Sequence, residues 1–196
     1  MTRWAWLWVA MLVIGQAVAQ ESPYLDQDPA ASYLGYPPGG RVKFRAMIQA
    51  ALQKNPRNVS ALVHRAHLYG EMGDRERELR DYDAALSASE PASPQRRHVH
   101  WSRGWSRYDQ GDIEGALADW AEAERLHGGR PAWVTYTRAL AYWTAGDHAT
   151  ALHWYALAAS AYPEWGTDAG MEQRIRYWSR PQQTQMRAVY ARWKAG

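Results

Sequence analysis

The fold is decided by residues 104–123, which read GWSRYDQGDIEGALADWAEA. Apolar and small residues recur at helical spacing on both sides of a central Gly111-Asp112 pair. Glycine suits the left-handed backbone position that ends one helix, and the aspartate can cap the start of the next. The stretch therefore predicts two helices joined by a tight turn.

The same pattern recurs before and after this stretch. Gly-Asp pairs stand at 73–74, 111–112 and 146–147, which are 38 and 35 residues apart. A small residue precedes each glycine by seven positions, and a large aromatic residue follows it by nine. The small residues are Ala66, Gly104 and Ala139, and the large ones are Tyr82, Trp120 and Tyr155. This period and this alternation are typical of stacked helical hairpins.

Three segments resemble the tetratricopeptide repeat (TPR) family: NPRNVSALVHRAHLYGEMGD, GWSRYDQGDIEGALADWAEA and RALAYWTAGDHATALHWYALAASAYP. The resemblance implies an all-α fold, a right-handed α-solenoid of about three helical hairpins. The implied repeats are 59–92, 97–130 and 132–165, with an N-terminal half-repeat at 43–56, so that the TPR domain covers 43–165. Glu78 stands where the family prefers alanine, which predicts a looser first hairpin.

The C-terminal residues 166–196 are predicted to form capping helices that cover the open end of the last repeat. Apolar residues repeat there at helical spacing on each side of Pro181, which is expected to break the helix. They are Met171, Ile175 and Trp178 on one side, and Met186, Tyr190 and Trp193 on the other.

The N-terminus predicts an export signal. Arg3 precedes an apolar run at 4–14, and Ala17-Val18-Ala19 forms the small-x-small pattern that signal peptidase cleaves before Gln20. An uncleaved membrane anchor is the alternative, but the run is much shorter than the roughly 20 residues that span a bilayer. We therefore expect a signal peptide at 1–19, no membrane span after cleavage, and export to the periplasm or, alternatively, to the extracellular space.

Composition excludes several function classes. The chain has no cysteine, so disulfides, thiolate metal sites and a cysteine nucleophile are excluded. A net charge of only +3 gives little support for nucleic-acid binding. Lysine occurs only at 43, 54 and 194, and this arginine bias is typical of a GC-rich bacterial genome. Residues 20–42 contain four prolines and predict a flexible tail rich in proline and tyrosine.

The repeat resemblance also implies which residues line the concave face. In the second and third repeats they are His98, Trp101, Trp105, Tyr108, Trp133, Tyr136 and Trp143. Such an aromatic groove suits ligands with apolar or flat faces. Two alternatives remain open: the groove binds a separate partner, or it is occluded by the protein itself, with the tail segment SYLGYPP at 32–38 as the occupant.

Catalytic patterns are missing from the sequence. The histidine pairs His64/His67 and His98/His100 lack a third metal ligand at fitting spacing, and no phosphate-binding loop is present. We expect no enzyme activity, no metal and no cofactor. The favoured hypothesis is a protein-interaction scaffold of the bacterial cell envelope that binds a peptide or extended segment in the groove. The alternative is a module that binds envelope polysaccharide through the same aromatic residues.

Overall fold

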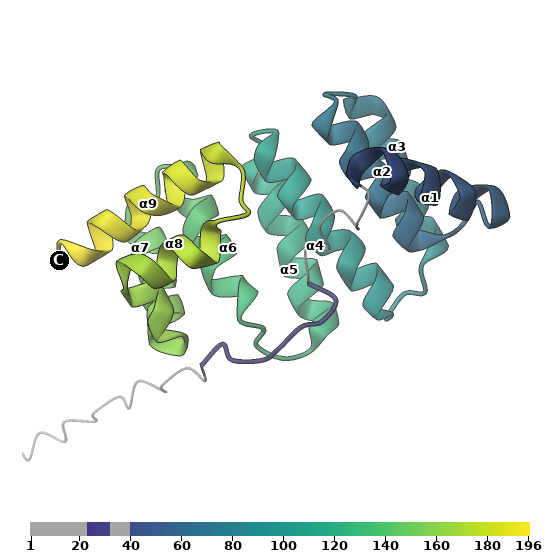
Figure 1. The fold of residues 1–196 in the computed structure, drawn as a ribbon. Coiled ribbons are helices and arrows are strands. Elements are labelled where there is room, and N and C mark those ends of the chain that lie inside the picture. The colour runs from purple at the N-terminus through teal and green to yellow at the C-terminus, as the bar shows by residue number, and fades with distance from the viewer. Residues whose placement is uncertain (1–22, 32–39) are drawn as a thin grey trace, which may run out of the picture.

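The computed structural model of the protein describes residues 23–31 and 40–196, and these residues form an all-α fold, as predicted (Figure 1). The expected signal peptide at 1–19 and the tail segment at 32–38 lie outside this part of the chain. The helices are α1 (Gly40–Lys54), α2 (Val59–Glu71), α3 (Arg75–Ala88), α4 (Pro94–Asp109), α5 (Ile113–His127), α6 (Trp133–Thr144), α7 (His148–Ala161), the 3₁₀ helix η1 (Pro163–Gly166), α8 (Asp168–Ile175) and α9 (Arg180–Lys194).

Consecutive helices pack in three pairs: α2 with α3, α4 with α5, and α6 with α7 (Figure 1). The two helices of each pair are joined by one of the Gly-Asp turns. Gly73, Gly111 and Gly146 have positive φ angles of 75°, 81° and 85°. The aspartate that follows each glycine caps the next helix by accepting from the backbone N–H three residues further on. The turn predicted from the Gly-Asp pairs is confirmed.

An arginine on the first helix of each pair reaches the side chain 16 residues later on the second. Arg65 donates two hydrogen bonds to Asp81, at 2.6 and 2.8 Å, and Arg103 donates two to Asp119, both at 2.8 Å. In the third pair the arginine is Arg138, whose guanidinium lies 4.5 Å from the ring centroid of Trp154. The three helix pairs therefore share one internal contact, with a cation–π pair in place of the last ion pair.

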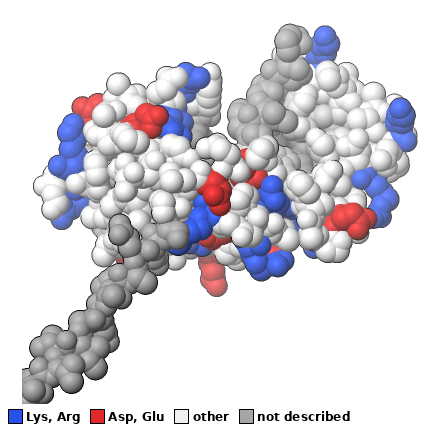
Figure 2. All heavy atoms as spheres, turned by 90° about the horizontal axis from the view of Figure 1, so that it is seen from below, with Lys and Arg blue, Asp and Glu red and all other residues white. Residues whose placement is uncertain are grey.

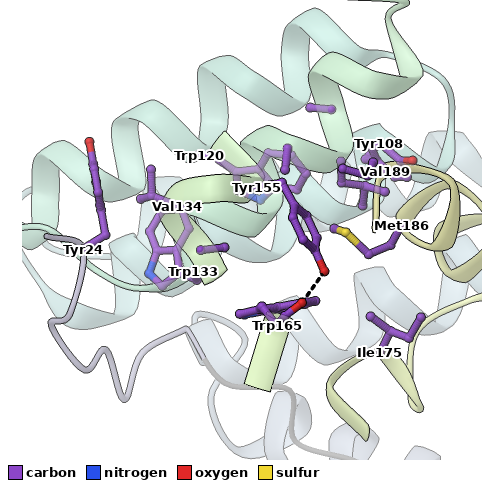
Figure 3. Close-up of a cluster of buried hydrophobic side chains, with 14 of the residues drawn as sticks. Tyr24, Tyr108, Trp120, Trp133, Val134, Tyr155, Trp165, Ile175, Met186 and Val189 are labelled. Atoms are coloured by element: carbon purple, nitrogen blue, oxygen red, sulfur yellow. Dashed lines mark hydrogen bonds between the residues drawn. The ribbon is translucent and has the colours of Figure 1, made fainter. Parts of the chain in front are cut away.

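The core is divided into two clusters of buried side chains. The first lies between α1, α2, α3 and the start of α4, and includes Ile48, Leu62, Tyr82 and Val99. The second extends from α4 to α9 and is dominated by aromatic rings (Figure 3). In it Tyr155 donates a hydrogen bond of 2.8 Å from its hydroxyl to the backbone oxygen of Trp165.

The C-terminal helix α9 packs against both α6 and α7, the last pair. Met171, Ile175 and Met186 are buried, as their spacing predicts. The prediction for Pro181 is wrong: α8 ends earlier, at Ile175, and Pro181 lies in the first turn of α9 behind the Ser179 cap. Proline is tolerated there because the first helical N–H groups have no intrahelical acceptor.

The prediction of a loose first hairpin at Glu78 is not supported by the packing. Gly70 on α2 leaves room for the Glu78 side chain, and a Cβ at Gly70 would lie 2.8 Å from the Glu78 Cδ. The buried carboxylate accepts hydrogen bonds from Arg75 on its own helix, from Ser106 on α4 and from Gln110 at the C-cap of α4. Glu78 therefore connects the first helix pair to the second through a satisfied polar contact.

None of the helices in the described ranges is long and apolar enough to cross a membrane. On the face shown in Figure 2, side chains of both charge signs are interspersed. On the C-terminal helices, Arg187 pairs with Glu172 at 2.6 Å and Lys194 with Asp168 at 2.9 Å. These pairs connect acidic side chains of α8 to basic side chains of α9 and so offset part of the positive charge of α9.

Candidate functional site

Residues 23–31, the N-terminal segment, lie against the second and third helix pairs. The chain here was expected to be a flexible tail, but the backbone of Asp26 forms an isolated parallel bridge with Pro131. The Asp26 N–H donates to the Arg130 oxygen and the Ala132 N–H donates to the Asp26 oxygen, each at 3.1 Å. The segment is thus held by main-chain hydrogen bonds, as an added peptide strand would be.

Tyr24 anchors the beginning of the N-terminal segment. Its side chain is buried, the Arg130 guanidinium lies 4.3 Å from its ring centroid, and the Trp154 ring packs edge-on at 5.6 Å. Tyr162 adds a hydrogen bond of 3.2 Å from its hydroxyl to the Leu25 backbone oxygen. A slot formed by α7 and the α5–α6 connection therefore receives one aromatic side chain.

Asp28 anchors the other end of the N-terminal segment, and its side chain is fully buried. The carboxylate accepts hydrogen bonds from Arg97 Nε at 3.0 Å and from the indole N–H of Trp133 at 3.1 Å. The nearby Ala30 oxygen lies 2.6 Å from His98 Nδ1. Burial of a carboxylate is costly unless it is paired, so this charge-assisted contact positions the segment specifically.

We define the acceptor site as the side chains that hold this segment: Arg97, His98, Arg130, Trp133, Trp154 and Tyr162. Only His98 and Trp133 were among the residues predicted from the sequence. The others were missed because they face a segment that is distant in sequence. The one signal that pointed to them was the tyrosine content of a tail that was predicted to be flexible.

The seven predicted groove residues do not line one open groove in the described part of the chain. Trp101, Tyr108 and Trp133 are buried in the core, with exposed fractions of 8%, 6% and 4%. The Trp101 ring stacks beside His98 at 6.2 Å, and the Tyr108 hydroxyl lies 2.7 Å from the Thr144 hydroxyl oxygen. These three side chains stabilise the packing of α4 and α6.

The connection between α8 and α9 places the Trp178 ring between the other aromatic residues. The Trp178 ring lies 5.2 Å from that of Trp105 and 5.7 Å from that of Tyr136. Trp143 lies at the edge of the cluster, where it stacks on His148 at 4.1 Å. Of the two alternatives left open by the sequence, these contacts favour occlusion by the protein itself, because residues 23–31 and Trp178 cover this face of α4 and α6.

Two buried indole N–H groups, those of Trp101 and Trp105, have no hydrogen-bond partner among the described residues. A buried unsatisfied donor costs on the order of 1–3 kcal/mol. Among the described residues, no group of three or more His, Asp or Glu side chains could hold a metal ion.

Comparison with known proteins adds no family assignment. No protein-family model matches this chain, and no curated protein is significantly similar to it.

Acidification is expected to lower the free energy of unfolding. Burial lowers the pKa of His98, and the hydrogen bond to Ala30 and the Asp28 charge oppose this only in part. The pKa of His64 is also lowered, by burial and then by the charges of His98 and His67. A base with a lowered pKa stabilises the fold fully above its ordinary value of 6.5, and this contribution is lost as the pH falls below 6.5.

Urea denaturation followed by tryptophan fluorescence above and below pH 6.5 measures this loss. His98→Asn keeps a donor for the Ala30 oxygen but cannot titrate, so its stability should vary less with pH than that of the wild type. An equal pH dependence in both proteins would exclude His98 as a contributor.

Proposed function

We propose that the protein is a non-catalytic interaction module built of TPR-like helical hairpins in a right-handed α-solenoid. Three observations support the repeat architecture: the three helix pairs, the Gly-Asp turn inside each pair, and the arginine that in each pair contacts the side chain 16 residues later. Repeat arrays of this kind bind extended segments on faces formed by successive first helices.

The observation that carries the proposal is the burial and hydrogen bonding of the Asp28 side chain in the acceptor site. A fully buried carboxylate, held by Arg97 on α4 and Trp133 on α6, lies between two successive first helices. In peptide recognition, main-chain hydrogen bonds supply affinity and side-chain slots supply specificity. The acceptor site has both, so the function we infer is the binding of an extended protein segment.

The expected signal peptide places this function in the cell envelope. The partner would then be a periplasmic protein or, alternatively, an extracellular one. The polysaccharide alternative needs open indole faces on which sugar rings stack, and no observation favours it, because Trp101 and Trp133 are buried.

Affinity capture with matched baits tests the proposed function. The baits are the mature chain from Gln20, Arg97→Gln and, as a control, Arg125→Gln. Arg125 is exposed, and within the described part of the chain it pairs with Glu122 on its own helix, at 2.6 Å. Circular dichroism must first show equal folding. We expect envelope protein partners to be recovered with the wild type and Arg125→Gln and lost with Arg97→Gln; identical capture by all three baits would contradict the acceptor site as the binding site.

A further inference from the structure

We propose that residues 23–31 are an internal mimic of the partner's segment. The acceptor site would recognise an extended segment in which a tyrosine is followed four residues later by Asp-Pro, and the N-terminal segment would compete with such a partner. This inference rests on the proposed function and adds to it the chemistry of the ligand and the regulation of the site.

The separate slots for Tyr24 and Asp28 explain why the acceptor site would recognise a tyrosine and an aspartate that are four residues apart. Tyr24 and Asp28 are the two side chains of the segment that are both buried and specifically held. Leu25, Asp26 and Gln27 between them are exposed, although the Asp26 carboxylate accepts from the Arg130 N–H and the Gln27 amide donates to the Tyr162 hydroxyl. The slots are fixed by different elements: Arg130 and Trp154 hold the ring, and Arg97 and Trp133 hold the carboxylate. A ligand must therefore present both groups at the distance that an extended chain of this length spans.

Proline after the aspartate fits the same geometry. A residue that precedes proline is disfavoured in helical conformation, which keeps Asp28 extended. Beyond Pro29 the chain turns. The Ala30 N–H donates to the Asp28 side-chain carboxylate at 3.0 Å, and the Ala31 N–H donates to the Asp28 backbone oxygen at 3.0 Å. This turn presents the Ala30 oxygen to His98. A partner with Asp-Pro at this place would reproduce the contact.

Exchange between the internal segment and a partner is physically feasible. Residues 23–31 contact α4, α5, α6, α7 and the connections that follow α5 and α7. The segment is not itself part of a helix pair, so it can leave without breaking one. A tethered segment competes at an effective concentration of about millimolar. Weakening the internal segment should therefore strengthen binding of the same sequence supplied from outside.

A labelled peptide with the sequence PYLDQDPAA is the probe for this exchange. We expect the full chain carrying Tyr24→Ala and Asp28→Asn to bind it about tenfold or more tightly than the wild type does, measured by fluorescence anisotropy. Adding Arg97→Gln should abolish this gain, whereas adding Arg125→Gln should not. A probe with both anchor residues changed in the same way should bind neither chain. Equal affinities of the two chains, or equal binding of the two probes, would overturn the inference.

Amide hydrogen exchange in the wild-type chain keeps the test decisive if the double variant does not fold. The Asp26 N–H is hydrogen-bonded to Arg130, so displacement of the segment should accelerate its exchange. Excess probe should increase this rate, and an unchanged rate at saturating probe would overturn the inference.

The two proposals can fail separately. If capture of a partner depends on Arg97 but the probe does not bind, the mimic is excluded and the proposed function stands. If capture does not depend on Arg97, the proposed function fails first. A dimer that forms at high protein concentration and is abolished by Arg97→Gln would assign the site to a second copy of this chain, and would overturn our choice of a separate partner.

Discussion

Replacement of Trp120 by alanine is expected to lower the free energy of unfolding by about 3–5 kcal/mol. The Trp120 side chain is 2% exposed, and its indole N–H donates to the Trp101 backbone oxygen at 3.2 Å. Its ring packs edge-on against that of Trp105, at 5.1 Å between centroids. Truncation would leave a large cavity between α4 and α5, which the surrounding rings cannot fill without moving.

Urea denaturation followed by far-ultraviolet circular dichroism measures this loss. Tyr177→Ala is the control, because its ring is 73% exposed, and its effect should stay within about 0.5 kcal/mol. If Trp120→Ala costs less than about 1 kcal/mol, the ring is not a core element and the assignment of the small and large positions in the repeat is wrong.

Gly104 provides an independent check on the same contact. A Cβ at Gly104 would lie 2.6 Å from the Cδ1 atom of Trp120, so Gly104→Ala should destabilise the wild type by about 1–3 kcal/mol. In the Trp120→Ala background the methyl group has room, and alanine is the better helix former by about 1 kcal/mol. A double-mutant cycle should therefore give a strong coupling between the two positions, and additive effects would contradict their contact.

The parts of the fold that follow from local chemistry could be predicted from the sequence. A Gly-Asp pair between two helical periods specifies a turn with few alternatives, and all three turns formed as expected. The small and large positions that flank each turn, such as Gly104 and Trp120, also became core contacts. These turns and contacts form between residues of one hairpin, so their pattern is visible in a short stretch of sequence.

The candidate site could not be predicted, because what covers a helix face depends on distant parts of the chain. The periodicity placed Trp105 and Tyr136 together on one side of α4 and α6, but it carried no information about Trp178, which contacts both of them. Similarly, nothing in the sequence distinguishes Arg97 from the other arginines, because its partner Asp28 lies 69 residues away in the chain. Glu78 was misinterpreted for a related reason, since its acceptance in the core depends on Gly70 and on donors from α4.

Replacement of Asp119 by alanine is the second change with a large expected effect, a loss of about 3–5 kcal/mol. The carboxylate is 2% exposed and accepts from His100 at 2.8 Å and from Arg103 at 2.8 Å, with Arg107 at 3.3 Å. Burial alone would raise the pKa of Asp119, but the hydrogen bonds from His100 and Arg103 and the positive charges of Arg103 and Arg107 lower it overall. Without Asp119, these donors lose their charged acceptor.

Asp81→Ala is the matched control, because Asp81 occupies the same place in the first helix pair and its carboxylate pairs with one side chain in the described residues, that of Arg65. Its loss should be smaller, about 1–3 kcal/mol. Equal losses at both positions would mean that the number of donors does not determine how much stability is lost.

Asp119→Asn tests the role of the charge through the dependence of stability on pH. Since the pKa of Asp119 is lowered by folding, its charge stabilises the protein above the ordinary value of 3.8, and this contribution is lost as the pH falls below 3.8. The stability difference between wild type and Asp119→Asn should therefore narrow in acid, and a constant difference would show that the carboxylate acts through its shape rather than its charge.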